Sequence, residues 1–211
     1  MNEKPHWLAG WVAALARLIS GARVLWLDCQ PSTRQRIYFG NHSSHLDAVI
    51  IWSALPPAVR ALTRPVAAQD YWERGLRWFL SERVFRAVLI PRAAPTGEKR
   101  FSAGRAALER MVEAMGKRNS LILFPEGTRG TGDEVQEFKG GLYHLCRLKP
   151  GVELVPVYLE NLNRILPKGE VLPVPLLSSV TFGPPVYLGE EEGKAEFLPR
   201  AREALCRLRP R

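Results

Sequence analysis

Short apolar runs alternate with longer segments of helical periodicity along most of this 211-residue chain. The apolar runs are bounded by turn residues, which is typical of buried strands, whereas apolar residues three and four positions apart indicate helices. The predicted strands cover residues 36–40, 59–63, 85–90, 120–124, 153–159 and 178–182. The predicted helices cover residues 7–19, 46–55, 70–84, 96–117, 140–148 and the tail from 196. This alternation predicts an α/β fold, with a central mixed sheet flanked by helices in a single layered domain.

The segment 70–84 places aromatic and aliphatic side chains at helical spacing. Packing of these side chains in the core is the favoured interpretation, and a groove for a lipid or an acyl chain is the alternative. The residues concerned are Tyr71, Trp72, Leu76, Phe79 and Leu80.

The first helical segment is mostly apolar over residues 7–27, close to the length of about 20 residues that a membrane span needs. Arg17 lies in its middle, and a central arginine costs about 2.5 to 3.5 kcal/mol on insertion scales, so a span is disfavoured. On a helical wheel the bulky apolar side chains occupy one arc of about 140°. They are Trp7, Leu8, Trp11, Val12, Leu15, Leu18 and Ile19.

Two tryptophans on that arc favour a helix that lies in the membrane interface, and a helix packed on the domain core is the alternative. The sequence therefore predicts a membrane-interface region over residues 1–27 and one folded domain over residues 28–211.

Composition adds a charge preference but no specific partner. Hydrophobic residues make up 46% of the chain, enough for a sizeable core. Lysine and arginine outnumber aspartate and glutamate by 30 to 21, and the formal charge of +9 favours an anionic surface or molecule. The three cysteines show neither a paired framework nor a zinc spacing, so we expect no metal site and a reducing compartment.

The strand predicted at 36–40 runs into a segment rich in acid–base groups, Asn-His-Ser-Ser-His-Leu-Asp, at residues 41–47. His42 and Asp47 would lie about 140° apart on a regular helix, so they can face each other only if the chain turns between them. Asp47 then falls in the first turn of the next helix, where the helix dipole favours a carboxylate. An imidazole held by a carboxylate can act as a general base towards a hydroxyl. The alternative is a capping serine beside a solvated histidine.

A second predicted strand, 120–124, opens into the loop Pro-Glu-Gly-Thr-Arg-Gly at residues 125–130. Backbone N–H groups and the guanidinium of Arg129 can converge on a phosphate there. Alone, such a loop is more often an ordinary surface turn. Together, the two segments offer a base and an anion-binding site.

The two segments together resemble the glycerolipid acyltransferases, a family that includes the lysophospholipid and 1-acylglycerol-3-phosphate acyltransferases. The resemblance rests on Asn41-His42-x-x-x-x-Asp47 followed by Phe124-Pro125-Glu126-Gly127-Thr128-Arg129, in the family's order, and it covers roughly residues 37 to 160. Four places depart from the family pattern. Leu89 stands where the family usually has an aromatic residue, and Gly130 stands where it often has a serine. Arg86 stands where the family usually has glycine, and Gln69-Asp70 stands where it often has a lysine-glutamate pair.

The resemblance implies transfer of a fatty acyl group from a thioester to a hydroxyl of a lysophospholipid such as 1-acylglycerol-3-phosphate. His42 would take the hydroxyl proton, and Asp47 would orient the imidazole of His42. The reaction would need no covalent acyl-enzyme. The positions that match the family's phosphate-binding residues are Arg92, Glu126, Gly127, Thr128, Arg129 and Lys139.

The implied co-substrate is an acyl-coenzyme A or acyl carrier protein thioester, with no further cofactor and no metal. The implied partners are the lysophospholipid acceptor, a membrane surface with anionic lipids and, for one type of donor, acyl carrier protein. From the apolar arc of residues 7–19 and the positive charge, we expect a membrane-associated protein at the cytoplasmic face.

Two other functions compete with acyl transfer. A hydrolase could use the same His-Asp pair on water, but the sequence has no G-x-S-x-G segment and no metal-ligand spacing. A non-catalytic membrane-binding module would account for the charge alone. Within acyl transfer itself, an acyltransferase for another lysolipid acceptor is the alternative. Nucleic acid is not expected, because basic and aromatic residues do not interleave on an exposed sheet.

Overall fold

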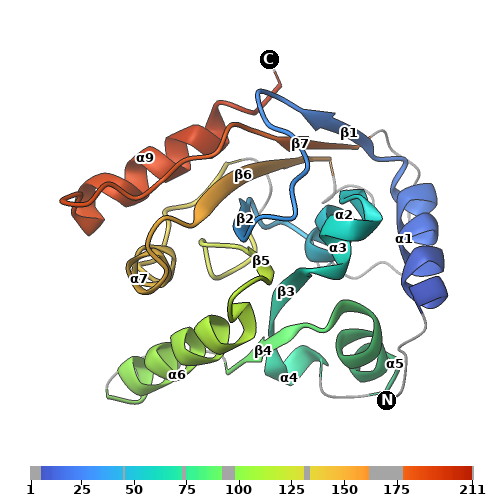
Figure 1. Ribbon diagram of the computed structural model, residues 1–211, viewed down its shortest axis with the longest axis horizontal. Helices are drawn as coiled ribbons and strands as arrows, with labels where there is room; N and C mark the ends of the chain where they lie inside the picture. The colour runs from blue at the N-terminus through green and yellow to red at the C-terminus, as the bar shows by residue number, and fades with distance from the viewer. Residues whose placement is uncertain are drawn as a thin grey trace.

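The computed structural model describes residues 6–44, 46–72, 75–91, 98–130, 134–161 and 178–210. These residues form a seven-stranded sheet in the order β1-β7-β6-β2-β5-β3-β4, seen nearly edge-on in Figure 1. The strands are β1 (Arg23–Trp26), β2 (Arg36–Gly40), β3 (Thr63–Ala68), β4 (Val88–Ile90), β5 (Ser120–Leu123), β6 (Glu153–Glu160) and β7 (Ser179–Phe182). The strands β6, β2, β5, β3 and β4 pair in parallel, and β7 pairs antiparallel to β6. The predicted mixed α/β sheet is confirmed.

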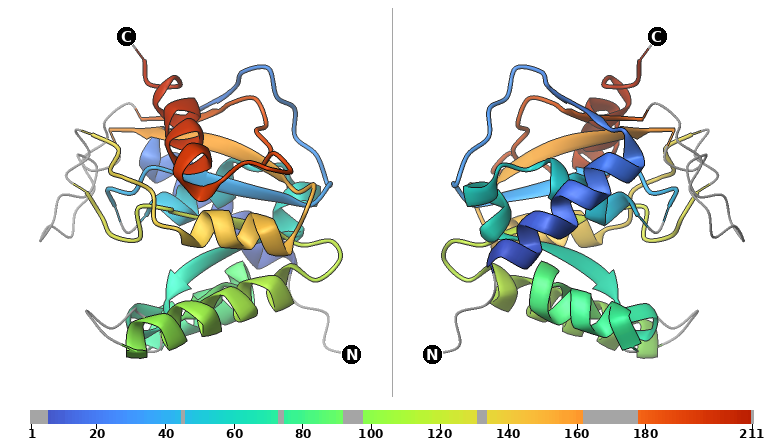
Figure 2. Two further views of the ribbon diagram at one scale, coloured as in Figure 1. Left: turned by 90° about the vertical axis from the view of Figure 1, so that its left-hand side faces the viewer. Right: turned by 90° about the vertical axis from the view of Figure 1, so that its right-hand side faces the viewer.

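Helices cover both faces of the sheet (Figures 1 and 2). One layer contains α6 (Glu98–Met115), α7 (Gly141–Leu148) and α9 (Lys194–Cys206), and the other contains α1 (His6–Ser20), α2 (Asp47–Ala54) and α3 (Pro57–Ala61). Alternate residues of β2 face opposite layers, as a strand requires. Ile37 and Phe39 pack on the side of α6, α7 and α9, whereas Tyr38 packs on the side of α1 and α2.

Two sequence predictions were wrong near the edges of the sheet. A strand was predicted over residues 59–63, but residues 57–61 form α3. Pro57 is favoured in the first turn of a helix, so it starts α3 and does not only end the previous helix. The strand follows it as β3 at Thr63–Ala68. The sequence analysis also missed β1, a four-residue strand that pairs with β7 from a distant part of the chain.

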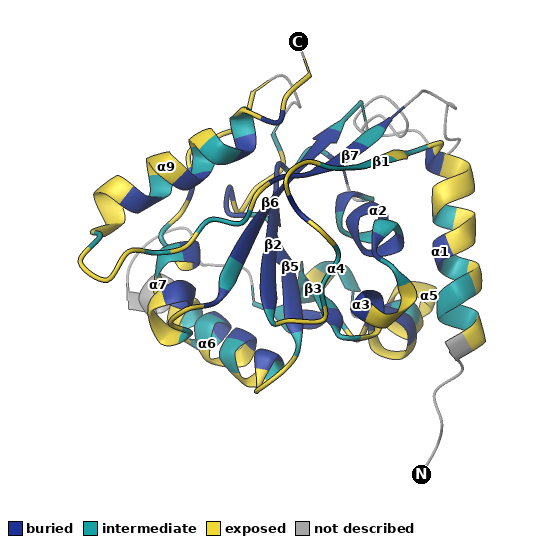
Figure 3. Cartoon of the chain, turned by 45° about the horizontal axis from the view of Figure 1, so that its top comes forward, coloured by how far each residue is buried: buried dark blue, intermediate teal, exposed yellow. Residues whose placement is uncertain are grey.

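One face of helix α1 packs against α2 and the domain core, and the opposite face is exposed (Figure 3). Ala13 is only 1% exposed, and Ala9 and Ala16 pack against the same core. Trp7 and Trp11 are 68% and 71% exposed. The helix therefore packs on the domain core, as the alternative interpretation expected, and leaves its tryptophans exposed; its placement in a membrane interface stays a prediction. No helix within the described residues is long and apolar enough to cross a membrane.

The helix predicted over residues 70–84 is three short elements, α4 (Gln69–Trp72), α5 (Gly75–Phe79) and the π-helix η1 (Leu80–Phe85). Gly75 has φ of +56°, a value that ends a regular helix and rotates the residues that follow. The prediction of core packing was therefore wrong for Leu76 and Phe79, which are 73% and 41% exposed. It was right for Trp72 and Leu80, which pack on the core.

Candidate active site

His42 and Asp47 meet where β2 passes into α2. The distance from His42 Nδ1 to Asp47 Oδ2 is 2.8 Å. The carboxylate of Asp47 is fully buried, while the imidazole is 23% exposed. An ionised carboxylate only accepts hydrogen bonds, so Nδ1 carries the proton and Nε2 keeps its lone pair for a substrate hydroxyl. The geometry is that of a positioned general base.

Asp47 also fixes the turn that the sequence spacing required. Its Oδ2 accepts hydrogen bonds from the backbone N–H groups of Ser43 at 2.7 Å and Ser44 at 2.8 Å. The serine side chains are therefore not the main caps of this helix, because the carboxylate in its first turn bonds the preceding N–H groups itself. One carboxylate oxygen thus holds both the loop and the imidazole.

The two residues that precede His42, Gly40 and Asn41, fix the position of the base relative to the sheet. Gly40 pairs with Val157 of β6, and a Cβ at position 40 would lie 2.9 Å from the Val157 carbonyl oxygen, so only glycine fits. Asn41 donates through Nδ2 to the Leu159 carbonyl and accepts the Leu159 N–H at Oδ1, both at 2.8 Å. These two bonds continue the pairing of β2 with β6 beyond the end of the strand.

Glu126 joins the histidine loop to the loop after β5. It is 2% exposed, and its Oε1 and Oε2 accept the backbone N–H groups of His42 at 2.8 Å and Gln136 at 3.1 Å. Burial raises the pKa of the Glu126 carboxyl, and the two backbone hydrogen bonds oppose that rise. The backbone N–H of Gly130 in turn donates to the carbonyl of His42 at 2.8 Å. The carboxylate therefore points at protein backbone rather than outward.

The aromatic ring of Phe124 holds the imidazole from the side. The two ring centroids are 4.2 Å apart and the planes are inclined by 12°, a stacked arrangement. Phe124 comes from the end of β5, the parallel neighbour of β2. The base is therefore restrained by a hydrogen bond at one nitrogen and by stacking on one face.

Gly127 and Lys139 lie together on the second loop. Gly127 has φ of +67°, and a Cβ there would lie 2.9 Å from both Cδ and Nζ of Lys139. The Lys139 backbone N–H donates to the Pro125 carbonyl at 2.8 Å, which places this lysine against the loop. The structure thus brings these two predicted site residues together, and their role in binding phosphate stays a prediction.

Thr128 and Arg129 follow Gly127 on the same loop and are exposed. Their side chains can therefore meet a solute without any rearrangement of the core. β4, which precedes Arg92, runs parallel to β3 and ends at Ile90. The predicted site residue Arg92 itself lies outside the described residues.

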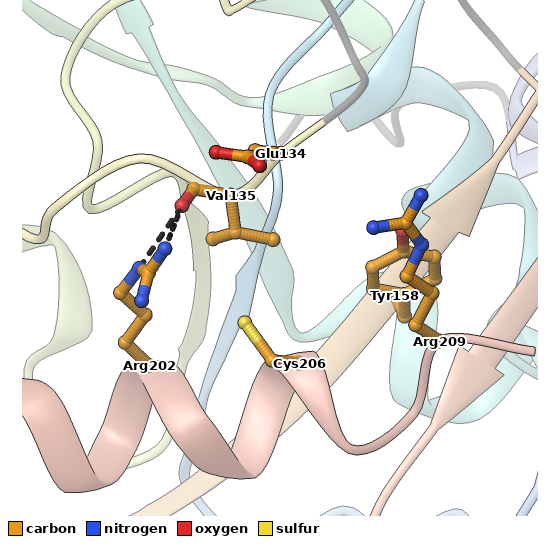
Figure 4. Close-up of a pocket in the computed structure, with 6 residues that line it drawn as sticks. All are labelled: Glu134, Val135, Tyr158, Arg202, Cys206 and Arg209. Atoms are coloured by element: carbon orange, nitrogen blue, oxygen red, sulfur yellow. Dashed lines mark hydrogen bonds between the residues drawn. The ribbon is translucent and has the colours of Figure 1, made fainter.

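Helix α9 supports this edge of the sheet from behind. Arg202 donates from Nε to the carbonyls of Val135 at 2.9 Å and Gln136 at 3.2 Å, and so fixes the segment that bonds Glu126. A cavity of about 250 Å³ lies beside this contact (Figure 4). Its lining is Glu134, Val135, Tyr158, Arg202, Cys206 and Arg209.

Asn41, Phe124 and Gln136 were not among the predicted site residues. A polar side chain directly after a buried strand is a signal that could have drawn attention to Asn41. The contacts of Phe124 and Gln136 depend on which loops come together in space, and local sequence carries no such information. The two described loops of the site meet at the carboxyl ends of the parallel strands β2 and β5, where ligands bind in open α/β sheets.

Comparison with known proteins places these loops in a family. A sequence model of the family described as Acyltransferase matches residues 24–160. The chain is 29% identical over 187 residues to a 1-acyl-sn-glycerol-3-phosphate acyltransferase of Limnanthes alba, covering 80% of this chain and 59% of the relative. It is 30% identical over 141 residues to the protein of the same name from Escherichia coli, covering 61% of this chain and 51% of the relative.

The fold has a solved counterpart. The crystal structure of the 1-acyl-sn-glycerophosphate (LPA) acyltransferase PlsC from Thermotoga maritima matches with a TM-score of 0.70 and 21% identity, covering 95% of this chain and 78% of the other. At that identity the match bears on the fold alone. The chain spans 59% of the length of the plant relative, so the activity of the whole relative does not transfer automatically.

Proposed function

This chain belongs to the acyltransferase family, and from that premise we propose that it moves a fatty acyl group from a thioester to a hydroxyl of a lysophospholipid such as 1-acylglycerol-3-phosphate. The observation that carries the proposal is the 2.8 Å contact between His42 Nδ1 and Asp47 Oδ2, which leaves Nε2 as the base. The names of the relatives supply the substrate class.

In the proposed reaction His42 Nε2 removes the proton from the acceptor hydroxyl, and Asp47 stabilises the imidazolium that forms. The oxygen attacks the thioester carbonyl, an O–C bond forms, and the C–S bond breaks. The imidazolium then returns its proton to the departing thiolate, so that the products are the ester and the free thiol. This direct transfer needs neither a covalent acyl-enzyme nor a cofactor beyond the thioester.

We assign the acceptor phosphate to the exposed cations of the second loop. Arg129 offers a planar fork of donors, Lys139 adds a point charge, and Gly127 and Thr128 offer backbone and hydroxyl groups. Arg92 is included on the family resemblance alone. Glu126 supports this site rather than contacting phosphate, because a carboxylate repels an anion and its two oxygens accept backbone N–H groups of the two loops.

We further propose that the protein works at the cytoplasmic face of a membrane with anionic lipids. The support is the open face of α1, where Trp11 and Leu18 are 71% and 80% exposed. An apolar face with tryptophans beside an arginine suits the headgroup region of a bilayer. The lysolipid acceptor and the acylated product would both reside there.

The direct test incubates purified protein with a panel of lysophospholipids and with long-chain acyl-coenzyme A or acyl carrier protein thioesters. Mass spectrometry of the lipids and titration of the released thiol should give one acylated lipid per thiol. Thiol release with free fatty acid and no acylated lipid would identify a hydrolase instead. The thioester that is consumed faster, that of coenzyme A or that of acyl carrier protein, identifies the donor. The lysophospholipid that is acylated fastest identifies the acceptor.

A further inference from the structure

We propose that α5 is a second bilayer-contacting element, which acts together with α1 to seat the active-site edge of the sheet on an anionic lipid surface. The inference rests on the membrane location in the proposed function and adds the second contact and the orientation. It starts from Leu76, Trp78 and Phe79, which the sequence did not predict to be exposed.

Helix α5 exposes large apolar side chains without burying any residue of its own. Leu76, Trp78 and Phe79 are 73%, 48% and 41% exposed, and none of the five residues of α5 is buried. Contiguous exposed apolar side chains on a soluble surface usually mark an interaction site. With Trp7, Trp11, Leu15, Leu18 and Ile19 of α1, these three make up most of the exposed large hydrophobic residues in the described part of the chain.

The exposure of α5 is fixed by its neighbours on both sides. Trp72 of α4 and Phe85 of η1 pack edge to face with centroids 6.0 Å apart, and Phe85 packs in the same way on Trp52 of α2 at 4.9 Å. Ser81 Oγ donates to the Trp78 carbonyl at 2.8 Å. The elements before and after α5 are thus anchored in the core, and α5 is held outward between them.

The topology brings the carboxyl end of α1 and the segment that leads into α5 to the edge of the sheet where His42 lies. β3 runs parallel to β5 and leads directly into α4, and α5 is the next helix in the chain. Both helices therefore follow the carboxyl end of a strand, as the loop of His42 does. The end of α1 reaches the same edge, because Ser178 Oγ donates to the Ser20 carbonyl at 2.9 Å next to the carboxyl end of β6. α1 also contacts η1, and Figure 2 shows α1 and α5 on one side of the molecule.

The charges on these elements favour a lipid surface over another apolar partner. Arg17, Arg77, Arg83 and Arg86 are exposed, and the exposed acidic residues described on the same elements are Asp70 and Glu82. Tryptophans combined with arginines match the boundary between acyl chains and anionic headgroups. A second copy of the chain would bring the same arginines against each other, which is unfavourable.

The test places an environment-sensitive fluorophore on α5. Leu76→Cys is labelled in a Cys206→Ser background, because Cys29 and Cys146 are buried and do not compete for the label. The matched control is Leu148→Cys on α7, which is 55% exposed but lies in the opposite helix layer (Figure 1). Leu18→Cys reports α1. Each protein is mixed with vesicles of zwitterionic lipid with and without an anionic lipid.

With anionic vesicles, the emission maximum of the fluorophore at positions 76 and 18 should shift to shorter wavelength. A quencher attached to the acyl chains should lower the emission at both positions, while the emission of the fluorophore at position 148 stays unchanged. A response at 18 without one at 76 would leave α1 as the contact and overturn the inference. Equal responses at 76 and 148, or none, would also overturn it. A dimer that already shields the label at 76 without lipid would make this face an interface between copies.

Activity separates this inference from the proposed function. The triple variant Leu76→Ser, Trp78→Ser, Phe79→Ser should lower turnover of vesicle-embedded acceptor by at least about tenfold, the effect of losing part of an apolar membrane contact. Its turnover of a soluble short-chain acceptor should be unchanged, which also shows that it folds. Equal activity of variant and wild type on vesicles would contradict the inference. Absence of transfer by wild type to any acceptor would refute the proposed function instead.

Discussion

The two loops of the candidate site differ in how firmly they are held. The loop of His42 is buried at both ends, with Asn41 bonded to β6 and Asp47 fully buried. The loop of Gly127 to Arg129 is exposed, and Lys139 lies over it from an equally exposed position. Glu126 is the connection between them.

This difference indicates a division of work. A base must hold its geometry before the substrate arrives, because small displacements cost large factors in rate. A phosphate-binding loop can remain open, since charge attracts the ligand and the donors adjust to it. Changes in the buried loop should therefore lower kcat, and changes in the exposed loop should mainly raise the acceptor KM.

The largest effect that separates the loops is expected for Asp47→Asn. An amide at this position cannot hold the imidazole tautomer and accept both serine N–H groups, so kcat should fall about 10² to 10⁴-fold. The free energy of unfolding should fall by about 1 to 3 kcal/mol, because a buried donor is left unpaired. Asp28→Asn is the control, since asparagine tolerates its φ of +49°. A rate within a few-fold of wild type would remove the carboxylate from the mechanism.

The next effect is expected for Arg129→Ala. Loss of a charge-assisted pair to phosphate should raise the acceptor KM about 10- to 100-fold and leave the thioester KM unchanged. Arg105→Ala serves as the control, because Arg105 is an exposed residue of α6 paired with Glu109. Initial rates with each substrate varied in turn decide the matter. If the thioester KM rises and the acceptor KM does not, the loop binds the donor.

A smaller change is expected for Lys139→Ala. Lys139 is an exposed point charge that is screened by solvent, so the acceptor KM should rise by roughly three- to tenfold. The difference from wild type should shrink as salt increases. Lys117→Ala, which removes an exposed lysine elsewhere, should leave KM unaltered at every salt concentration. A salt-independent loss of kcat would instead show that Lys139 supports the fold of the loop through Gly127.

The smallest effect concerns pH and the connection between the loops. Burial raises the pKa of the Glu126 carboxyl above its ordinary 4.5, so the folded state holds this proton more tightly than the unfolded chain. Stability should therefore fall as pH rises from about 4.5 through the raised pKa of the folded state. Glu126→Gln should flatten this slope in thermal melts recorded across that range. A slope identical to wild type would show that Glu126 does not titrate there.

Much of the fold follows from local pattern, and the exceptions have physical causes. The central strands β2, β5 and β6 are buried on both faces, so their sequences are uniform apolar runs. These runs predicted the bounds of the three strands closely. β1 is short and only partly buried, and its pairing with β7 brings together residues 23–26 and 179–182. The periodicity of residues 70–84 led to the wrong prediction of one helix, because a helical wheel assumes a continuous helix. Gly75 interrupts that helix.

In the candidate site, too, some contacts could be predicted from the sequence and others could not. The pairing of His42 with Asp47 could be predicted, since their spacing requires a turn and the local sequence supplies one. The position of Glu126 could not, because its partners are the backbone groups of His42 and Gln136, which local sequence does not bring together. A motif identifies which residues take part, but only tertiary contacts decide which of them face the ligand.

The most direct test of the central claim is the rate of acyl transfer by His42→Ala at saturating acceptor and donor, with His144→Ala, an exposed histidine on α7, as the matched control. Removing a general base should lower kcat about 10² to 10⁴-fold. The acceptor KM and the melting curve should stay close to those of wild type, because the exposed loop remains intact. A kcat within a few-fold of wild type in the folded variant would contradict the assignment of His42 as the base.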